Sequence, residues 1–206
     1  MSLPCSPAAE RNRNAILQVL LEELPETGTV LEIASGTGQH AVHCAPRLAP
    51  RLWQPTDQTP ESLASIEAWR TTQPCPTLLA PQTLDVREAP WCVEARPPGE
   101  PVTAILAINM IHIAPWSCCE ALLDGAQRLL PTGGVVYLYG PYQRAGEHTA
   151  PSNAAFDIDL RRRNPEWGVR NLEDVIAAAQ QRHLHLRKTV EMPANNLSLI
   201  FSYQPG

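Results

Sequence analysis

Basic residues and long apolar runs are both scarce in this sequence. Of its 206 residues, 16 are lysine or arginine and 21 are aspartate or glutamate, which gives a formal net charge of -5. A chain with this charge has no global field that attracts a phosphate backbone or an anionic lipid surface. The longest apolar run, residues 102–114, is interrupted by Thr103, Asn109 and His112 and is shorter than the roughly 20 residues that span a bilayer. We therefore expect neither a nucleic acid nor a membrane as a partner.

Paired cysteine motifs and a secretion signal are missing as well. The six cysteines include no CxxC pair, and the adjacent Cys118 and Cys119 have a spacing that suits neither a zinc site nor an ordinary disulfide. The apolar residues nearest the N-terminus are interrupted by Gln18, Glu22 and Glu23, so no signal peptide is expected. These features predict reduced thiols, a cytoplasmic location and no bound metal.

Apolar residues and proline are plentiful. The hydrophobic content of 44% excludes a disordered chain, and the 21 prolines indicate a surface that is rich in proline rather than in charge. The length fits one domain. We expect a single domain over residues 1–206, in which an N-terminal helix within residues 1–25 starts at Ser6-Pro7 and packs near the functional site.

Strands and helices are predicted to alternate along the chain. Expected buried strands cover residues 29–34, 52–55, 77–84, 102–108 and 135–139, and residues 141–152 are expected to form a loop. Two late strands, about 186–192 and 197–203, are so close in sequence that they must form an antiparallel pair. The pattern predicts an α/β fold with a seven-stranded, mostly parallel, doubly wound sheet that ends in an antiparallel hairpin and carries its site at the carboxyl ends of the strands.

A glycine-containing loop follows the first expected strand. Gly36 and Gly38 let a ligand approach the backbone, and the start of the next helix offers free N–H groups. The alternative is an ordinary strand–helix turn. No lysine lies near these glycines and the GxxxxGK pattern is absent, so no triphosphate is expected. Residues 36–41 also match the GxGxxA pattern, which keeps a nicotinamide-dependent oxidoreductase as an alternative.

Three carboxylates support a ligand site at this edge of the sheet. Glu32 lies inside an apolar strand, where an unpaired carboxylate is costly to bury, so it should have a fixed partner. Asp57 follows Gly38 by 19 residues, an offset at which a carboxylate can bind ribose hydroxyls. Asp85 follows the third strand. Each acid could instead be a surface residue or a helix cap.

Residues 31–38, with the sequence LEIASGTG, resemble the first motif of class I S-adenosylmethionine-dependent methyltransferases, with Ala34 where many members have glycine. Nearly the whole chain is similar to a small methyltransferase-like family of unknown function typified by methyltransferase-like protein 26. The blocks that carry this resemblance are SPAAERN (6–12), WQPTD (53–57), NMIHIAPW (109–116), YGPY (139–142), NPEWGVR (164–170) and MPANNL (192–197).

The resemblance implies S-adenosylmethionine as the cofactor. The cofactor-binding residues that it implies are Glu32, Ala34, Ser35, Gly36 and Gly38 around the loop under the methionine end, Asp57 at the ribose, Leu84 and Asp85 at the adenine, and Asn109 beside the methyl group. The expected activity is methyl transfer to O, N or S of a small molecule. An alternative is a cofactor-binding module without catalytic activity, whose proline-rich surface docks a partner protein.

Methyl transfer needs alignment of the reacting atoms and, for some acceptors, removal of a proton. His112, just past the fourth strand, could take that proton, and Tyr142, after the fifth strand, could orient the acceptor. The alternatives are a histidine that packs the loop and a surface-exposed tyrosine.

Candidate acceptor contacts occur at three further places. Arg11 and Asn12 could bind a carboxylate of the acceptor, and Asn195 and Asn196 could supply polar groups, whereas the alternatives are a solvated helix face and a hairpin turn. The basic run of residues 161–163, with Arg170, could bind an anionic substrate or simply face solvent. The sequence does not fix the oligomeric state.

Overall fold

The computed structural model describes residues 5–206, so the first four residues of the predicted domain and of its N-terminal segment lie outside the described residues. The chain divides into one compact unit that ends at Leu106 and a second that runs from Ala107 to Gly206. A seven-stranded sheet has the strand order β3-β2-β1-β4-β5-β10-β9. This order confirms the predicted α/β fold and places the most apolar strand, β4 (Val102–Ile108), in the middle of the sheet.

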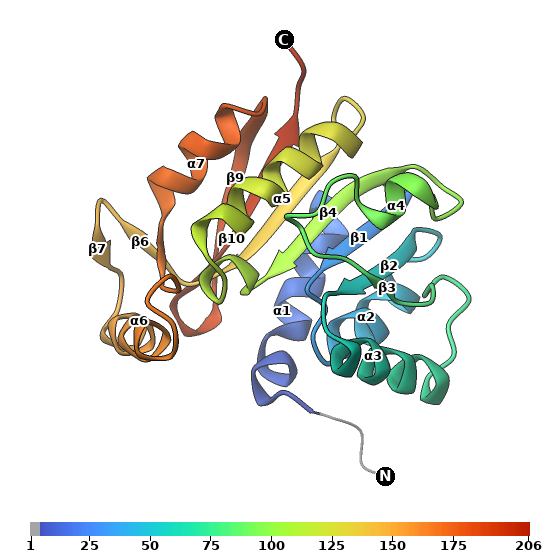
Figure 1. Cartoon of the computed structure of the whole chain (residues 1–206), viewed down its shortest axis with the longest axis horizontal. Coiled ribbons are helices and arrows are strands. Elements are labelled where there is room, and N and C mark those ends of the chain that lie inside the picture. The colour runs from blue at the N-terminus through green and yellow to red at the C-terminus, as the bar shows by residue number, and fades with distance from the viewer. Residues whose placement is uncertain (1–4) are drawn as a thin grey trace. The chain divides into compact units, whose positions relative to one another are not determined.

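The first unit is built around the parallel strands β1 and β2. Its elements are α1 (Pro7–Glu23), β1 (Thr29–Ile33), α2 (Gln39–Cys44), the 3-10 helix η1 (Ala45–Arg47), β2 (Leu52–Asp57), α3 (Pro60–Thr72), β3 (Gln82–Thr83) and α4 (Cys92–Ala95), and it also contains most of β4. The helix α2 packs against both α1 and α3 (Figure 1). As predicted, α1 starts after Ser6, whose hydroxyl accepts a hydrogen bond from Ala9 N–H.

The second strand extends two residues beyond the predicted segment 52–55. Pro55 was expected to limit its length before the chain closes on Asp57, and β2 instead includes Asp57, with Pro55 buried inside the strand. Trp53 exchanges backbone hydrogen bonds with Thr77 and Leu79, and the pairing is then interrupted until Gln82 and Thr83 pair with Thr56 and Asp57. The Gln54 amide donates instead to the Ala80 carbonyl at 2.8 Å. The donor that proline lacks is therefore not needed at this position.

The third strand is shorter than predicted. Of residues 77–84, only Gln82 and Thr83 form β3, and Leu78 makes an isolated bridge to Trp53. Pro81 separates these two contacts, because proline cannot donate to the ladder.

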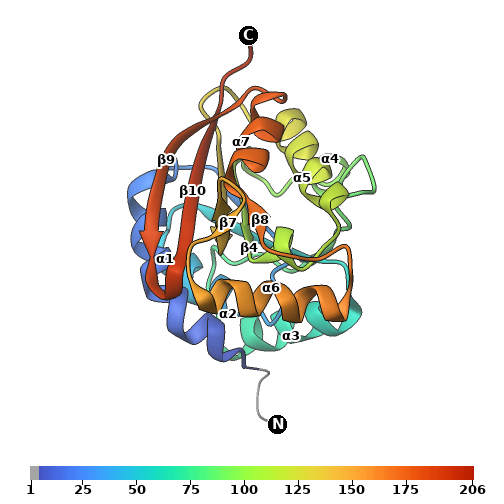
Figure 2. The ribbon, with the colours of Figure 1, turned by 90° about the vertical axis from the view of Figure 1, so that its left-hand side faces the viewer.

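The second unit contains the antiparallel end of the sheet. Its elements are the 3-10 helix η2 (Met110–His112), α5 (Trp116–Leu129), β5 (Val135–Gly140), β6 (Tyr142–Arg144), β7 (Glu147–His148), α6 (Pro151–Arg163), β8 (Arg170–Asn171), α7 (Leu172–Gln180), β9 (Leu184–Met192), the 3-10 helix η3 (Pro193–Asn195) and β10 (Asn196–Tyr203). Figure 2 shows β9 and β10 side by side, and β10 is antiparallel to both β9 and β5. The predicted hairpin is confirmed.

Residues 141–152 are not a simple loop, which corrects the prediction. Within them, β6 and β7 pair antiparallel, and β6 also pairs in parallel with β8. These three strands form a small second sheet with the order β7-β6-β8. Backbone groups that a loop would leave to water are thereby satisfied by β-sheet hydrogen bonds.

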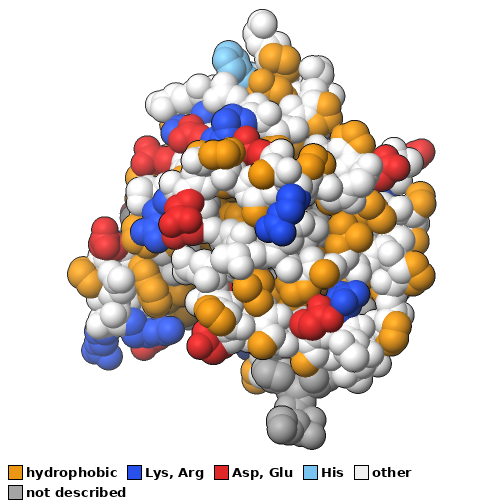
Figure 3. Space-filling view, turned by 45° about the vertical axis from the view of Figure 1, so that its right-hand side comes forward, with side chains coloured by type: hydrophobic (Ala, Val, Ile, Leu, Met, Phe, Trp, Pro, Cys, Tyr) orange, Lys and Arg blue, Asp and Glu red, His pale blue; other side chains and the backbone are white. Residues whose placement is uncertain are grey.

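The surface carries no large field of one charge on the face that Figure 3 shows, where acidic and basic side chains of the described residues are interspersed among polar and apolar ones. Among the helices that the structure describes, none combines the length and the apolar character needed to cross a membrane. The cysteines from Cys5 onward, which include the buried neighbours Cys118 and Cys119, are all free thiols.

Candidate functional site

The loop between β1 and α2 leaves its main chain open to a ligand. Ala34 is exposed, and a Cβ built on Gly36 would meet nothing within 4 Å. Both residues have positive φ angles, 55° at Ala34 and 56° at Gly36. Gly38 is different, because a Cβ there would lie 2.9 Å from the Ile66 Cα. Gly36 therefore provides an accessible backbone, whereas Gly38 permits the close packing of α3.

The carboxylate of Asp57 holds this loop from the end of β2. Its Oδ2 accepts the Gly36 N–H at 3.0 Å, and its Oδ1 accepts the N–H and the hydroxyl of Thr59 at 3.1 and 3.2 Å. Ser35 is buried beside them, and its N–H donates to the Thr56 carbonyl at 2.8 Å. The structure thus brings Ser35, Gly36 and Asp57 together as the sequence predicts.

Glu32 lies in β1 and is 2% exposed. Its predicted fixed partner is Trp53, whose indole N–H donates to Glu32 Oε2 at 3.0 Å. Burial raises the pKa of Glu32 to about 7, against the lowering effect of the hydrogen bonds from Trp53 and Ser35, and the nearby Asp57 charge raises it further. Because the Glu32 side chain is buried in the sheet, it can influence the glycine loop but cannot contact a ligand directly.

The N-terminal helix is fastened to the first turn of α2. The Gln39 side chain accepts a hydrogen bond from Ser6 N–H and donates to Glu10 Oε1 at 2.8 Å. Asn12 is buried, and its Oδ1 accepts the His40 Nε2–H at 2.8 Å. This contact engages Asn12 within the protein, and its role in binding an acceptor stays a prediction. Its neighbour Arg11 is exposed.

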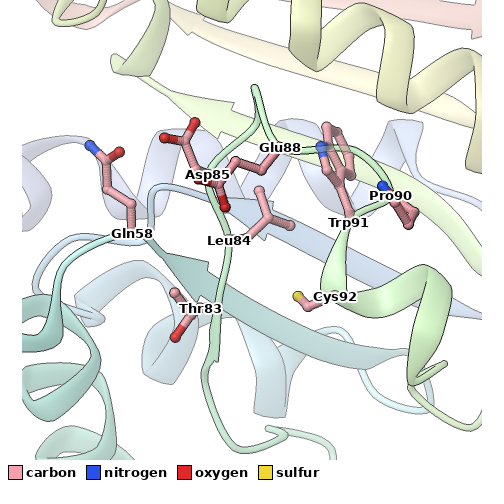
Figure 4. Close-up of a pocket in the computed structure, with 8 residues that line it drawn as sticks. All are labelled: Gln58, Thr83, Leu84, Asp85, Glu88, Pro90, Trp91 and Cys92. Carbon is pink, nitrogen blue, oxygen red and sulfur yellow. The ribbon is translucent and has the colours of Figure 1, made fainter.

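A cavity of about 470 Å³ opens where β2 and β3 end (Figure 4). It is lined by Gln58, Thr83, Leu84, Asp85, Glu88, Pro90, Trp91 and Cys92. Figure 4 shows Gln58 and Trp91 on opposite sides, with Asp85 between them. The Arg87 guanidinium binds Asp85 at 2.6 Å and holds the pKa of that carboxyl below its usual range, so Asp85 is ionised.

Sequence reasoning identified two of these lining residues, Leu84 and Asp85, and missed the others. The available signal was the position of Gln58, which directly follows Asp57 and so lies at the same strand end. Trp91 comes from the proline-rich segment that precedes β4.

Asn109 ends β4 in the second unit with a φ of 60°, and its N–H donates to the Tyr139 carbonyl at 2.7 Å. The side chain of Asn109 is half-buried. Asparagine is one of the few residues that adopt this left-handed conformation readily. The end of β4 is therefore turned sharply into η2.

His112 is fully buried, and its Nδ1 accepts the Arg170 N–H at 3.3 Å. Burial, with the Arg170 charge as the next cause, lowers the pKa of His112 to about 3, so the ring is neutral. Because Nδ1 uses its lone pair as an acceptor, the ring proton is on Nε2. His112 as a proton acceptor stays a prediction, and the engaged Nδ1 together with the proton on Nε2 counts against it.

The alternative interpretation of Tyr142, a surface-exposed tyrosine, is wrong, because its side chain is completely buried. Its ring meets the His112 ring edge-on at a centroid distance of 4.9 Å. Its hydroxyl has no hydrogen-bond partner among the described residues, and burial raises its pKa well above the usual value. In this arrangement Tyr142 packs His112 and does not face an acceptor.

The turn between β9 and β10 has largely the ordinary chemistry of a hairpin. Asn195 has a φ of 58°, and its carbonyl accepts the Asn153 amide at 2.9 Å. The Asn196 amide donates to the Tyr139 hydroxyl at 3.1 Å. Since Leu197 pairs with Gly140, this turn lies at the carboxyl end of β5.

Two residues of the basic run in α6 pair with acids of the same helix. Arg161 binds Asp157 at 2.9 Å, and Arg163 lies 3.9 Å from Asp159. Both arginines are exposed, but Asp157 is buried, so only the pair of Arg163 and Asp159 lies on a solvated helix face.

A family model described as "Protein of unknown function (DUF938)" matches residues 3–203. Human N-acetylserotonin methyltransferase in complex with S-adenosylmethionine is 12% identical with a TM-score of 0.77, over 96% of this chain and 53% of that one. An O-methyltransferase family 2 protein from Planctomyces limnophilus in complex with apigenin is 18% identical with a TM-score of 0.78, over 96% and 58%. CalO1, a methyltransferase of calicheamicin biosynthesis with S-adenosylhomocysteine bound, is 15% identical with a TM-score of 0.71, over 92% and 54%.

These structural similarities establish the fold, which is that of S-adenosylmethionine-dependent methyltransferases. The chain spans little more than half the length of each of these proteins.

The two loop glycines should differ in their cost of substitution. Gly36→Ala meets open space and should lose only the roughly 1–2 kcal/mol of a left-handed alanine. Gly38→Ala has the same conformational cost and also collides with Ile66, which adds about 1–3 kcal/mol. Urea unfolding of both variants measures the difference, and equal losses would contradict the packing role of Gly38.

The stability of the free protein should depend on the ionisation of Glu32. Its folded pKa of about 7 lies above the ordinary value of 4.5, so the folded state holds a proton that the unfolded state has released. The stability that Glu32 contributes is thus fully present below about pH 4.5 and is lost as the pH rises through about 7. Glu32→Gln keeps an acceptor for Trp53 and does not titrate. From urea unfolding across this range, the variant should gain about 3 kcal/mol relative to wild type, and parallel pH profiles would refute the prediction.

Proposed function

The chain belongs to this family of proteins of unknown function (DUF938), and from that premise we propose that it is an S-adenosylmethionine-dependent methyltransferase that acts on O, N or S of a small molecule. The observation that carries the proposal is the open main chain at Gly36, held by Asp57, within a methyltransferase fold. The finer assignment to the small family typified by methyltransferase-like protein 26 is also proposed, on the residue blocks that resemble it.

The residues around the loop fit such a cofactor. Ala34 to Gly38 offer backbone without obstructing side chains, Asp57 lies at the end of β2, and the cavity beside Leu84 and Asp85 is large enough for a planar group. The Asp57 carboxylate beside the loop, and the lack of lysine and arginine in residues 34–38, suit a ligand with positive charge. When bound, the cofactor supplies an activated methyl group on a sulfonium.

The same contacts disfavour a dinucleotide with a diphosphate. Gly36 N–H is bound to Asp57, and Gly38 N–H is bound to the Ser35 carbonyl at 3.0 Å. Two of the loop donors that would hold a diphosphate are therefore occupied, and the first of them by an acid. The nicotinamide-dependent oxidoreductase is thus the weaker reading.

We assign the following roles within this proposal. Asp57 binds the ribose, Leu84 and Asp85 line the adenine end, and Asn109 lies beside the methyl group. His112 acts as a neutral hydrogen-bond donor or packing residue rather than as a base, which favours an acceptor whose nucleophile needs no base from His112. Arg11 and the Asn195–Asn196 turn are the candidate acceptor contacts that remain exposed or half-buried.

The free thiols support the further proposal that the protein resides in the cytoplasm. The burial of both residues first considered catalytic, His112 and Tyr142, favours a second candidate function. In it the chain binds the cofactor without turnover and docks a partner protein.

We expect S-adenosylmethionine and S-adenosylhomocysteine to stabilise the protein. At 100 times the dissociation constant the gain is about 2.7 kcal/mol, or roughly 5–10 °C in Tm for a chain of this size. Gly36→Val should abolish the shift, because its side chain fills the open space over the loop. Thermal unfolding with each ligand, and with NADH for comparison, measures this.

Gly133→Val is the matched control, since Gly133 also has a positive φ and open space around its Cβ but lies in the turn before β5. It should keep the full ligand shift. A shift with NADH alone, or equal shifts in both variants, would contradict the proposed site. Release of S-adenosylhomocysteine with a candidate acceptor separates the enzyme from the binding module.

A further inference from the structure

Residues 164–170 are bonded to the loop that follows β4, residues 109–116, through Gly168 and Arg170. The Gly168 N–H donates to the His112 carbonyl at 3.0 Å, and the Arg170 N–H donates to His112 Nδ1 at 3.3 Å. The segment is itself anchored to α6, because Asp157 Oδ1 accepts the Val169 N–H at 2.7 Å. We call residues 164–170 the strap.

The side chain of Arg170 binds main-chain carbonyls at the end of η2. Its Nε donates to the Ile111 carbonyl at 2.9 Å, and its Nη2 donates to the carbonyls of Ala114 and Glu166. The guanidinium also lies over the Trp116 ring, 5.8 Å from its centroid. The last carbonyls of a helical turn lack partners within the turn, and the planar fork of arginine reaches several of them at once.

These contacts exclude the role in binding an anionic substrate that the basic run suggested for Arg170. Its donors are directed at three main-chain carbonyls within the protein. The cavity of about 400 Å³ that Arg170 shares with Trp116 and Asp174 is therefore bordered by an arginine that is already engaged.

The strap also fixes the orientation of the His112 ring. With Nδ1 occupied, the Nε2–H points to Gly140, where a Cβ would come within 2.5 Å of Nε2 and 3.2 Å of Asn109 Oδ1. Nε2 is a buried donor without a partner among the described residues. His112 and Asn109 thus face the same place at the ends of β4 and β5, and glycine at 140 leaves room for both.

We propose that Arg170 is a positioning residue: through Ile111, His112 and Ala114 it holds the loop that presents Asn109, and it keeps His112 in the form that is protonated on Nε2. The role of Asn109 in binding a ligand rests on the proposed function, whereas the ordering of the loop by Arg170 does not. The effect of Arg170 on the loop and its effect on ligand binding can therefore be tested separately.

The test compares Arg170→Met and Arg170→Lys with wild type. Methionine keeps the aliphatic part of the side chain over Trp116 and the backbone N–H but removes the guanidinium group. Lysine keeps the charge and can reach one carbonyl. Arg162→Met is the matched control, because Arg162 is exposed on α6. Circular dichroism checks that each variant is folded. If Arg170→Met does not fold, Arg170→Lys alone is compared with wild type.

The first measurement uses the protein without ligand. In a long-range ¹H–¹⁵N spectrum of histidine-labelled wild type and Arg162→Met, His112 should show one protonated and one unprotonated ring nitrogen. Arg170→Met removes the side-chain bonds to Ile111 and Ala114 that hold the strap against the loop, so the backbone N–H of residue 170 should no longer stay on His112 Nδ1. The separation of the two ¹⁵N shifts should then shrink as the ring samples both forms, with a smaller change in Arg170→Lys. Unchanged His112 signals in both Arg170 variants would overturn the inference.

The second measurement is the affinity for S-adenosylmethionine by calorimetry. Arg170→Met should bind about tenfold more weakly, the loss of one well-placed contact, with Arg162→Met unchanged and Arg170→Lys in between. Equal affinities, with the ring spectrum altered, would overturn the link between the strap and the ligand. If wild type binds no S-adenosylmethionine, the proposed function fails, and the spectra still decide the role of Arg170.

Discussion

The hydrogen bond from Gly36 N–H to the Asp57 carboxylate is the contact on which the proposed site depends. It joins the end of β1 to the end of β2, so the loop is held by the sheet rather than by its own side chains. A charged acceptor makes such a bond stronger than a neutral one. Because Asp57 also binds Thr59 at the start of α3, one carboxylate fixes both the glycine loop and the next helix, and the main chain at Gly36 stays open.

Buried polar groups stabilise the surroundings of each functional element. In the first unit, Glu32 and Trp53 form a hydrogen bond inside the sheet beneath the loop. In the second, Arg170 and His112 order the loop after β4. Such networks stabilise a single arrangement only when nearly all of their members are satisfied. Among the described residues of the second unit, His112 Nε2, the Tyr142 hydroxyl and His148 Nδ1 are buried without a partner and depart from that rule.

Periodicity and turn chemistry were sufficient to predict most of the fold. The alternation of strands and helices, the antiparallel end and the start of α1 at Ser6 follow from local patterns. The length of β2 was underestimated at Pro55, because a proline within a strand is tolerated where pairing with the neighbouring chain is interrupted. The glycine loop and Asp57 were found because their spacing is local. Tyr142 and Arg170 were misjudged, because their burial is created by segments that lie far from them in the sequence, and no residue pattern records that.

The most direct measurement is an amide ¹H–¹⁵N titration with S-adenosylmethionine. The Gly36 resonance should shift strongly, because its N–H lies in the loop that receives the ligand, whereas the Gly133 resonance should not move. A ligand that shifts neither, or that shifts Gly133 and leaves Gly36 in place, would contradict the account.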